Sequence, residues 1–242
     1  MVVTEIFPLN EGVLDPGLFK AVFMAGPPGA GKNYVIEKLG LYHMGLKLQD
    51  IDHALAAVHK VDPSSANYDR SLEVITKRQS VLQRGMLGMV INTTGRDVSS
   101  LMRLRRELKA AGYQSCMVFV DVDEFIAIDR VHDRKNTSTS PFDAKREVTM
   151  DYFNLAYPGA RKQIEFYQYM FGDDFSMVTN NVLKPDRPGY IELDQIEHTK
   201  VFNSTMATAH KMVSSFMRRP ITKLAQEKIN DAASHRKNRR SQ

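Results

Sequence analysis

The hydrophobic residues of this chain gather in short apolar runs, separated by longer segments in which apolar and polar positions alternate with a helical spacing. Five runs have the length and composition of strands, and they lie at residues 18–25, 45–49, 86–91, 115–122 and 175–179. The segments between them carry apolar residues three and four positions apart, which predicts helices. This alternation predicts an α/β fold with three layers, in which a mostly parallel five-stranded sheet lies between two layers of helices.

The same pattern divides the chain into parts. Residues 1–17 contain two prolines and two glycines, which predicts an arm rather than a strand or a helix. Residues 18–181 form the α/β domain, and a turn-rich stretch then leads to two further helices, a helical extension at 182–234. The last residues, 235–242, are basic, and we expect a disordered tail there.

Composition limits the classes of protein to be considered. The chain has 242 residues, of which 43% are hydrophobic and 25% charged, as in ordinary soluble globular proteins. No apolar run approaches the roughly 20 residues of a membrane span, and no signal-peptide pattern begins the chain, so we expect a cytoplasmic protein. The single cysteine, Cys116, lies in an apolar run and predicts a buried strand thiol, and the histidines lack a paired zinc-ligand spacing.

The strongest chemical signal follows the first apolar run directly. It consists of Gly26, Pro27, Pro28, Gly29, Ala30, Gly31, Lys32, Asn33 and Tyr34. Glycines let successive backbone N–H groups point around a phosphate, and the helix that follows adds its partial positive charge. Lys32 supplies a mobile charge to the outer phosphates. We therefore predict a binding loop for a nucleoside triphosphate, ATP or GTP; the alternative is a glycine-rich turn with a surface lysine.

One position departs from the usual phosphate-binding loop. Asn33 stands where a Ser or Thr hydroxyl ordinarily contacts Mg²⁺. Its amide oxygen is a hard ligand of the kind that Mg²⁺ accepts, so Asn33 is our candidate metal ligand. The alternative leaves that coordination position to water.

Polar residues follow two further strands. Asp50 and Asp52 come after the second strand, and Asn92, Thr93 and Thr94 follow the third. In open α/β sheets, ligands bind in the crevice beside the carboxyl ends of the strands. Asp52 is thus a candidate for binding or activating a substrate, although an N-cap of the next helix is the alternative role.

Two arginines predict a mobile lid around residues 130–142. Arg130 and Arg134 are four positions apart and so lie on one helical face, beside the small and polar stretch 135–141. Arginines next to a mobile loop suggest a lid that closes on phosphates. The alternative is that the two arginines are exposed to solvent and form surface ion pairs with Asp129 and Asp133.

Taken together, these motifs resemble the P-loop kinases related to polynucleotide kinase and zeta toxin, over about residues 18–181. The resemblance implies a P-loop NTPase fold and a kinase that uses Mg²⁺. It implies that Asp52, beside Asp50, is the base for the acceptor hydroxyl, that Arg130 and Arg134 are lid arginines, and that the strand end with Thr93, Thr94 and Arg96 binds substrate. Asn33 and Asn92 depart from the group, since many P-loop enzymes have an acidic residue at the second position. Phage kinases that phosphorylate hydroxymethyluracil in DNA are a possible nearer relative.

The favoured function is transfer of the γ-phosphoryl group of ATP or GTP to a hydroxyl on nucleic acid, either a 5′ end or a hydroxymethylated base. The net charge of +5, the pI of about 9.2 and the clusters Arg103–Arg106, Arg218–Arg219 and Arg236–Arg240 favour this acceptor. One alternative is a small-molecule kinase that acts on a nucleoside, a nucleotide or a nucleotide sugar. The other is a nucleotide-binding module without transfer activity. The sequence does not predict the oligomeric state.

Overall fold

The structure is a computed structural model, and it describes residues 17–62, 64, 67–137, 148–183 and 191–240. Of residues 134–137 and 235–240 it describes only the backbone. The expected arm up to residue 16, the loop of the expected lid from residue 138 and the turn-rich stretch at 184–189 lie outside the described residues.

Each of the five apolar runs overlaps one strand, and the five strands form one sheet. The strands are β1 (Lys20–Ala25), β2 (Lys47–Gln49), β3 (Met89–Asn92), β4 (Gln114–Asp121) and β5 (Phe175–Thr179). Their order across the sheet is β2-β3-β1-β4-β5, and every neighbouring pair is parallel. The expected parallel sheet is confirmed, with β1 at its centre.

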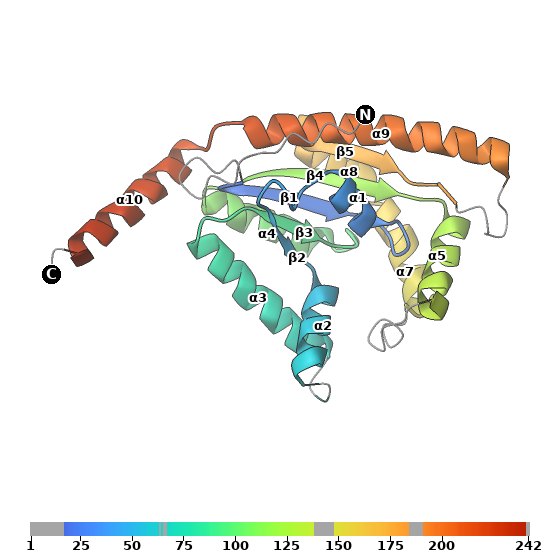
Figure 1. Cartoon of the computed structure of the whole chain (residues 1–242), viewed down its shortest axis with the longest axis horizontal. Coiled ribbons are helices and arrows are strands. Elements are labelled where there is room, and N and C mark those ends of the chain that lie inside the picture. The colour runs from blue at the N-terminus through green and yellow to red at the C-terminus, as the bar shows by residue number, and fades with distance from the viewer. Residues whose placement is uncertain (1–16, 63, 65–66, 138–147, 184–190, 241–242) are drawn as a thin grey trace.

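Helices connect the strands and cover both faces of the sheet (Figure 1). In the described residues they are α1 (Lys32–Lys38), α2 (Ile51–Val61), α3 (Tyr68–Arg84), α4 (Val98–Ala110), α5 (Glu124–Thr137), α7 (Met150–Arg161), α8 (Ile164–Phe171), the short 3₁₀ helix η1 (Gly172–Asp174), α9 (Glu192–Arg218) and α10 (Lys223–Arg240). None of these helices has both the length and the apolar composition needed to cross a membrane.

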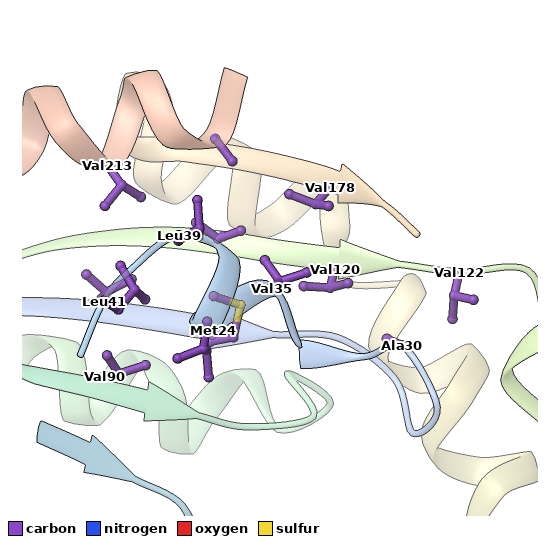
Figure 2. Packing of buried hydrophobic residues seen from close by; sticks show 14 of the residues in the cluster. Met24, Ala30, Val35, Leu39, Leu41, Val90, Val120, Val122, Val178 and Val213 are labelled. Carbon is purple, nitrogen blue, oxygen red and sulfur yellow. The ribbon is translucent and has the colours of Figure 1, made fainter. Parts of the chain in front are cut away.

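Alternate residues of the central strand face opposite layers of helices. Val22 and Met24 belong to one buried cluster, shown in Figure 2, which also contains side chains of α1, α5 and α9. Ala21 and Phe23 belong to a second cluster, with side chains of α3, α4 and α8. Because both faces of the sheet are covered, its strands read as continuous apolar runs, and the expected three layers are confirmed. Cys116 is buried in β4, as its apolar surroundings predict.

The helix α9 forms part of the core, although the sequence pattern places it in an extension. Its residues Ala209, Val213 and Phe216 are completely buried against the sheet. At its carboxyl end, the Nζ atom of Lys20 in β1 donates hydrogen bonds to the carbonyl oxygens of Phe216 at 3.2 Å and Arg219 at 2.8 Å. Figure 1 shows that α9 runs along the length of the sheet, whereas α10 projects beyond the amino ends of the strands.

One local expectation from the sequence differs from the structure. The basic stretch at 235–240 is helical, because α10 continues to Arg240; Lys and Arg are good helix formers, so the helical preference of this stretch outweighs the tendency of a charged terminus to be disordered. The helix α7 contains Pro158, which removes one backbone hydrogen bond of the helix. Packing of Ala156 and Ala160, both completely buried, outweighs the cost of the missing hydrogen bond.

Candidate active site

The loop between β1 and α1 is held from behind by two other elements. Gly29 and Gly31 have φ values of 78° and 82°, which L side chains rarely adopt. A Cβ atom at Gly29 would lie 2.3 Å from the carbonyl oxygen of Ala127 in α5, and one at Gly31 would lie 2.5 Å from the Asn180 amide nitrogen. Both glycines are therefore needed for the backbone conformation and for the close approach of the neighbouring elements.

Lys32 folds back over the loop that precedes it. Its Nζ atom donates hydrogen bonds to the carbonyl oxygens of Gly26 at 2.8 Å and Pro27 at 3.1 Å. No side chain caps the amino end of α1, and its first turn contains no acidic residue. Backbone N–H groups and an ammonium group thus gather at one place, which is the arrangement that binds phosphate.

A pocket of about 550 Å³ opens beside the loop at the carboxyl ends of β2 and β3. We call it the Asp52 pocket. It brings together many of the residues predicted from the sequence, namely Pro28, Gly29, Gly31, Lys32, Asn33, Tyr34, Asp50, Asp52, Thr93 and Thr94. The phosphate-binding loop, an acidic strand end and two threonine hydroxyls thus share one cavity.

Asp50 and Asp52 have different surroundings in this pocket. Asp50 is buried and caps α2, because its Oδ1 atom accepts hydrogen bonds from the backbone N–H groups of Asp52 at 2.7 Å and His53 at 3.3 Å. The structure therefore assigns the N-cap to Asp50, and the alternative role for Asp52 as the cap is wrong. Asp52 lies in the first turn of α2, is half-buried and lines the pocket.

An amide network joins the loop to this acidic residue. The Asn92 Nδ2 atom at the end of β3 donates to Asn33 Oδ1 at 3.0 Å and to Asp50 Oδ2 at 2.5 Å. β3 is the direct neighbour of β1, and Asn92 lies beside Met24 in the register of the sheet. The two asparagines that depart from the P-loop kinase pattern are therefore in contact with each other.

The side-chain oxygen atoms of the Asp52 pocket provide only some of the ligands that Mg²⁺ needs. No group of three or more His, Cys, Asp or Glu side chains is arranged to hold a metal ion in the described part of the chain. Asn33, Asp50 and Asp52 line the same pocket, and Mg²⁺ typically takes one or two carboxylates together with substrate phosphates and water. The donor set thus fits Mg²⁺ that arrives with a nucleotide.

The acidic residue at the end of β4 has another role. Asp121 forms an ion pair with Arg161 of α7, with Oδ1 3.0 Å from Nε and Oδ2 3.1 Å from Nη2. Burial raises the pKa of Asp121, and the Arg161 charge opposes that shift. Asp121 therefore ties α7 to the sheet.

A second pocket, of about 460 Å³, lies on the other side of the loop. We call it the Arg130 pocket, and its walls come from α5, α9 and the chain after β5. Arg130 donates hydrogen bonds to the carbonyl oxygens of Gly29 at 3.2 Å and Val182 at 2.8 Å, and to Asn180 Oδ1 at 3.3 Å. Burial lowers the pKa of the Arg130 guanidinium, which still stays charged. Gly31 and Tyr34 line both pockets, so the loop separates them.

Of the two predicted lid arginines, the structure describes the side chain of Arg130 but not that of Arg134. Arg130 points toward the loop and the end of β5 and does not line the Asp52 pocket. The backbone of Arg134 continues α5, but its side chain and the loop after Thr137 lie outside what the structure describes. The lid therefore stays a prediction.

Arg96 is not part of the lining of the Asp52 pocket, but it contacts a residue that is. Its guanidinium carbon is 5.8 Å from the centre of the Tyr152 ring, and Tyr152 lines the pocket. Of the other predicted site residues, Gly26, Pro27 and Ala30 belong to the loop without lining either pocket.

Two of the arginine clusters lie at the opposite end of the sheet. Arg219 pairs with Asp174 at 2.6 Å, and its carbonyl oxygen binds Lys20 at the start of β1. Arg105 stacks on Phe171 at 4.3 Å and donates to Ser115 Oγ at 3.2 Å. The length of β1, about 20 Å at 3.3 Å per residue, separates this end from the loop. These arginines hold the core together and are far from both pockets.

Sequence reasoning missed three residues that shape the site. Asn180 binds both Arg130 and the Ala30 carbonyl oxygen, the latter at 2.8 Å. Tyr68 and Tyr152 form walls of the Asp52 pocket, and Asn92, predicted only as part of a polar strand end, joins its two sides. The polar end of β5 was available as a signal for Asn180, whereas nothing local distinguishes the tyrosines from ordinary surface residues.

The comparison with protein families finds a match over residues 22–156 to the family described as AAA domain (AAA_33). A comparison with curated proteins gives no match. Among solved structures, the AvrRxo1-ORF1:AvrRxo1-ORF2 complex with sulphate ions is similar, with a TM-score of 0.56 and 11% identity over 77% of this chain and 64% of that chain. The chain thus spans less than two thirds of the length of that protein.

Two further structures are similar to this chain. AvrRxo1-ORF1:-ORF2 with ATP gives a TM-score of 0.56 and 10% identity over 80% of this chain and 76% of that chain. A structure from the PezAT toxin-antitoxin system of Streptococcus pneumoniae gives a TM-score of 0.49 and 14% identity over 82% of this chain and 87% of that chain. At these identities the likeness to the two AvrRxo1 structures supports the P-loop NTPase-like fold alone.

Proposed function

The chain belongs to the AAA_33 family of AAA domains, and from this membership and the geometry of its site we propose that it is a kinase. It transfers the γ-phosphoryl group of ATP or GTP to a hydroxyl group of a second substrate. One observation carries the proposal: the phosphate-binding loop stands between two pockets, of about 460 and 550 Å³, which is what a reaction with two substrates requires.

The Arg130 pocket is the proposed site of the donor nucleoside. Its lining includes Gly31 of the loop and the apolar side chains of Leu183 and Phe202, which suit a planar base. The triphosphate then follows the loop and points its γ-phosphate toward the Asp52 pocket. The AvrRxo1 structure with ATP, which shares the fold, supports ATP as the donor.

Lys32 changes partners when the donor binds. In the structure its ammonium group is bonded to two carbonyl oxygens of the loop. Phosphate oxygens are stronger acceptors for an ammonium group than neutral carbonyls are. Lys32 therefore moves from the loop to the outer phosphates, where it stabilises the charge that spreads over them during transfer.

Asp52 acts on the acceptor. Its half-buried carboxylate lies in the same pocket as the loop and is not used as the helix cap. It orients the acceptor hydroxyl and takes its proton, while the acceptor oxygen bonds to the γ-phosphorus and the bond from that phosphorus to the leaving diphosphate breaks. Thr93 and Thr94 line the same wall and offer hydroxyl groups that hold the acceptor in place.

Mg²⁺ is part of the proposal. Asn33 and the carboxylate of Asp50 would hold it together with the phosphates of the nucleotide. When bound, Mg²⁺ supplies positive charge that neutralises the phosphates and favours their attack by a hydroxyl. The hydrogen bonds from Asn92 fix the orientation of Asn33 and Asp50 for this role.

The sequence predicts a nucleic-acid hydroxyl as the acceptor, and the prediction depends on the arginine clusters. Two arginines of these clusters, Arg105 and Arg219, instead make internal contacts at the far end of the sheet. A pocket of about 550 Å³ has the size of ordinary small-molecule sites. The structure therefore favours an acceptor that fits the pocket, either a small hydroxyl compound or the terminal nucleotide of a strand.

Incubation with γ-labelled ATP, Mg²⁺ and a panel of nucleosides, nucleotides, nucleotide sugars and oligonucleotides tests this function. Label transfer to one class that is lost in the Lys32→Ala variant supports the kinase. Oligonucleotides should be tested over a salt series, because binding along a phosphate backbone weakens steeply with salt. Tight binding of ATP without transfer to any class would support the rival function, a nucleotide-binding module without catalysis.

A further inference from the structure

Arg96 is a cation held beside the acceptor side of the site. It forms no ion pair in the described part of the chain, where the salt bridges involve Arg70, Arg161 and Arg219. Its guanidinium lies over the ring of Tyr152, which is a wall of the Asp52 pocket. Arg96 thus differs from Arg130, whose guanidinium is taken up by three protein acceptors.

The position of Arg96 is fixed from two directions. A Cβ atom at Gly159 of α7 would lie 2.8 Å from Arg96 Cγ and 3.1 Å from Cδ, so the stem of Arg96 passes through space that only glycine leaves open. On the other side, the turn before Arg96 is anchored by Tyr167, whose hydroxyl donates to the Gly95 carbonyl oxygen at 2.7 Å. An arginine that served only solubility would need neither constraint.

We propose that the acceptor carries an anionic group, a phosphate ester or a carboxylate, which binds Arg96 on the Tyr152 ring while the acceptor hydroxyl lies at Asp52. This inference rests on the proposed kinase function and adds the chemical class of the acceptor. Guanidinium binds carboxylate and phosphate through two parallel hydrogen bonds, which gives orientation as well as affinity. The Tyr152 ring holds the guanidinium plane in place by a cation–π contact.

An anionic acceptor also explains why the site has one cation for the donor and a second for the acceptor. Lys32 lines the Asp52 pocket on the donor side, and Arg96 lies against Tyr152, another residue of its lining. The carboxylate of Asp52 repels an anionic acceptor, and the charge of Arg96 offsets that repulsion. Arg96 is therefore a specificity-determining residue, and Gly159 is a positioning residue that acts through it.

Matched pairs of acceptors test this inference with the full chain. The pairs are uridine with uridine 5′-monophosphate, glucose with glucose 6-phosphate, and glycerol with glycerol 3-phosphate and with glycerate; an oligonucleotide with a free 5′ hydroxyl distinguishes a strand from a free anion. We expect an anionic member to have a kcat/KM about 10- to 100-fold above that of its neutral partner. In Arg96→Gln that preference disappears, mainly through KM, because Arg96 contacts a part of the acceptor that does not react.

Three further variants separate charge, position and surface effects. Arg96→Lys keeps the charge without the planar fork and should retain part of the preference. Gly159→Ala should lower the preference without removing any charge, because its Cβ atom displaces the Arg96 stem. Arg103→Gln removes an exposed arginine of α4, which donates to Ser100 Oγ at 3.5 Å, and should leave the preference unchanged.

The outcomes distinguish the inference from the function on which it rests. Equal use of neutral and anionic members, or an unchanged preference in Arg96→Gln, overturns the inference and leaves the kinase. Transfer to no acceptor at all contradicts the proposed function, and the inference falls with it. Loss of preference in Arg96→Gln and in Gly159→Ala, with the KM for ATP unchanged in both, supports the inference.

Discussion

Asn33 in the phosphate-binding loop and Asn92 at the end of β3 are hydrogen-bonded to each other at 3.0 Å. They are the two positions at which the sequence departs from the P-loop kinase pattern, a hydroxyl at the first and an acidic residue at the second. The contact shows that the two departures occupy one place in the structure. Because the Asn92 amide also binds Asp50, the acidic charge at this place comes from the residue that follows β2 and not from β3.

Asn92→Asp should lower stability at neutral pH by about 1–3 kcal/mol, because it removes the donor to Asp50 and places two carboxylates side by side. Such a pair raises the pKa of one member, so the folded state takes up a proton more readily than the unfolded state does. The deficit in unfolding free energy should therefore shrink as the pH falls from about 7 to about 5. Urea unfolding at both pH values measures it.

Asn181→Asp is the matched control for that variant. The Asn181 amide also donates to a carboxylate, Asp123 Oδ2 at 2.8 Å, but this pair is exposed to solvent. We expect a loss below about 0.5 kcal/mol, since water screens exposed like charges. Equal losses in the two variants would show that the Asn92 network has no special role.

Substitutions of Asp50 and Asp52 should lower the stability of the protein by different amounts. Asp50→Ala removes the cap of α2 and the acceptor for Asn92, and we expect a loss of about 1–3 kcal/mol. Asp52→Ala should cost less than Asp50→Ala, because Asp52 is not the cap. Thermal unfolding of the two variants provides the comparison, and a larger loss for Asp52→Ala would reverse the assignment.

The two adjacent acids illustrate what the sequence can and cannot predict. The apolar run before Asp50 predicts a strand, and the rules for α/β sheets place both carboxylates at the ligand-binding edge. Which of them caps the helix depends on where the first helical turn begins, and a shift of one or two residues exchanges their roles. Local patterns predict helix boundaries only to within a few residues, so the capping role could not be assigned from the sequence.

Arg130 and Tyr152 illustrate a second limit, since the sequence does not predict which elements pack against each other. The spacing of Arg130 and Arg134 predicts a shared helical face but not what that face meets. The rotation of α5 is set by its packing on the loop, where the Ala127 carbonyl group reaches Gly29. In the same way Arg96 meets Tyr152 and Gly159 only through the packing of α7 on the sheet. The loop itself was predictable because its chemistry depends on consecutive residues.

Gly31→Ala should be more harmful than Gly40→Ala, although both glycines have positive φ values, 82° and 67°. A Cβ atom at Gly31 would lie 2.5 Å from Asn180 Nδ2, whereas one at Gly40 would have no atom of the described residues within 4 Å. Gly40→Ala should cost about 1 kcal/mol from backbone strain alone, and Gly31→Ala about 2–4 kcal/mol together with its ATP affinity. Unfolding and ATP titration of both variants test the comparison, and equal losses would contradict it.

Lys20 should give a distinctive dependence of stability on pH. Burial, assisted by the nearby Arg219 charge, lowers the pKa of Lys20 from its ordinary value of 10.5 to about 8. Between these values the unfolded chain binds more protons at this residue than the folded chain does, so the contribution of Lys20 to stability rises with pH.

Lys20→Met provides the reference for this measurement. The unfolding free energy of the wild type minus that of Lys20→Met should increase from about pH 7.5 to about pH 9.5, because the other titrating groups are common to both proteins. Urea unfolding at several pH values gives the difference. A difference that stays constant or falls over this range would mean that the ammonium group is better solvated than its burial indicates.

The central claim is that the loop binds the donor and that Asp52 acts on the acceptor. It is tested most directly by the rate of γ-phosphoryl transfer from labelled ATP in the Asp52→Asn variant, measured beside its ATP affinity, with Lys32→Ala as the variant that disables the donor side. We predict that Asp52→Asn binds ATP as the wild type does and transfers the phosphoryl group about 10²- to 10⁴-fold more slowly, as expected when a general base is removed. Transfer by Asp52→Asn at the wild-type rate would contradict the account.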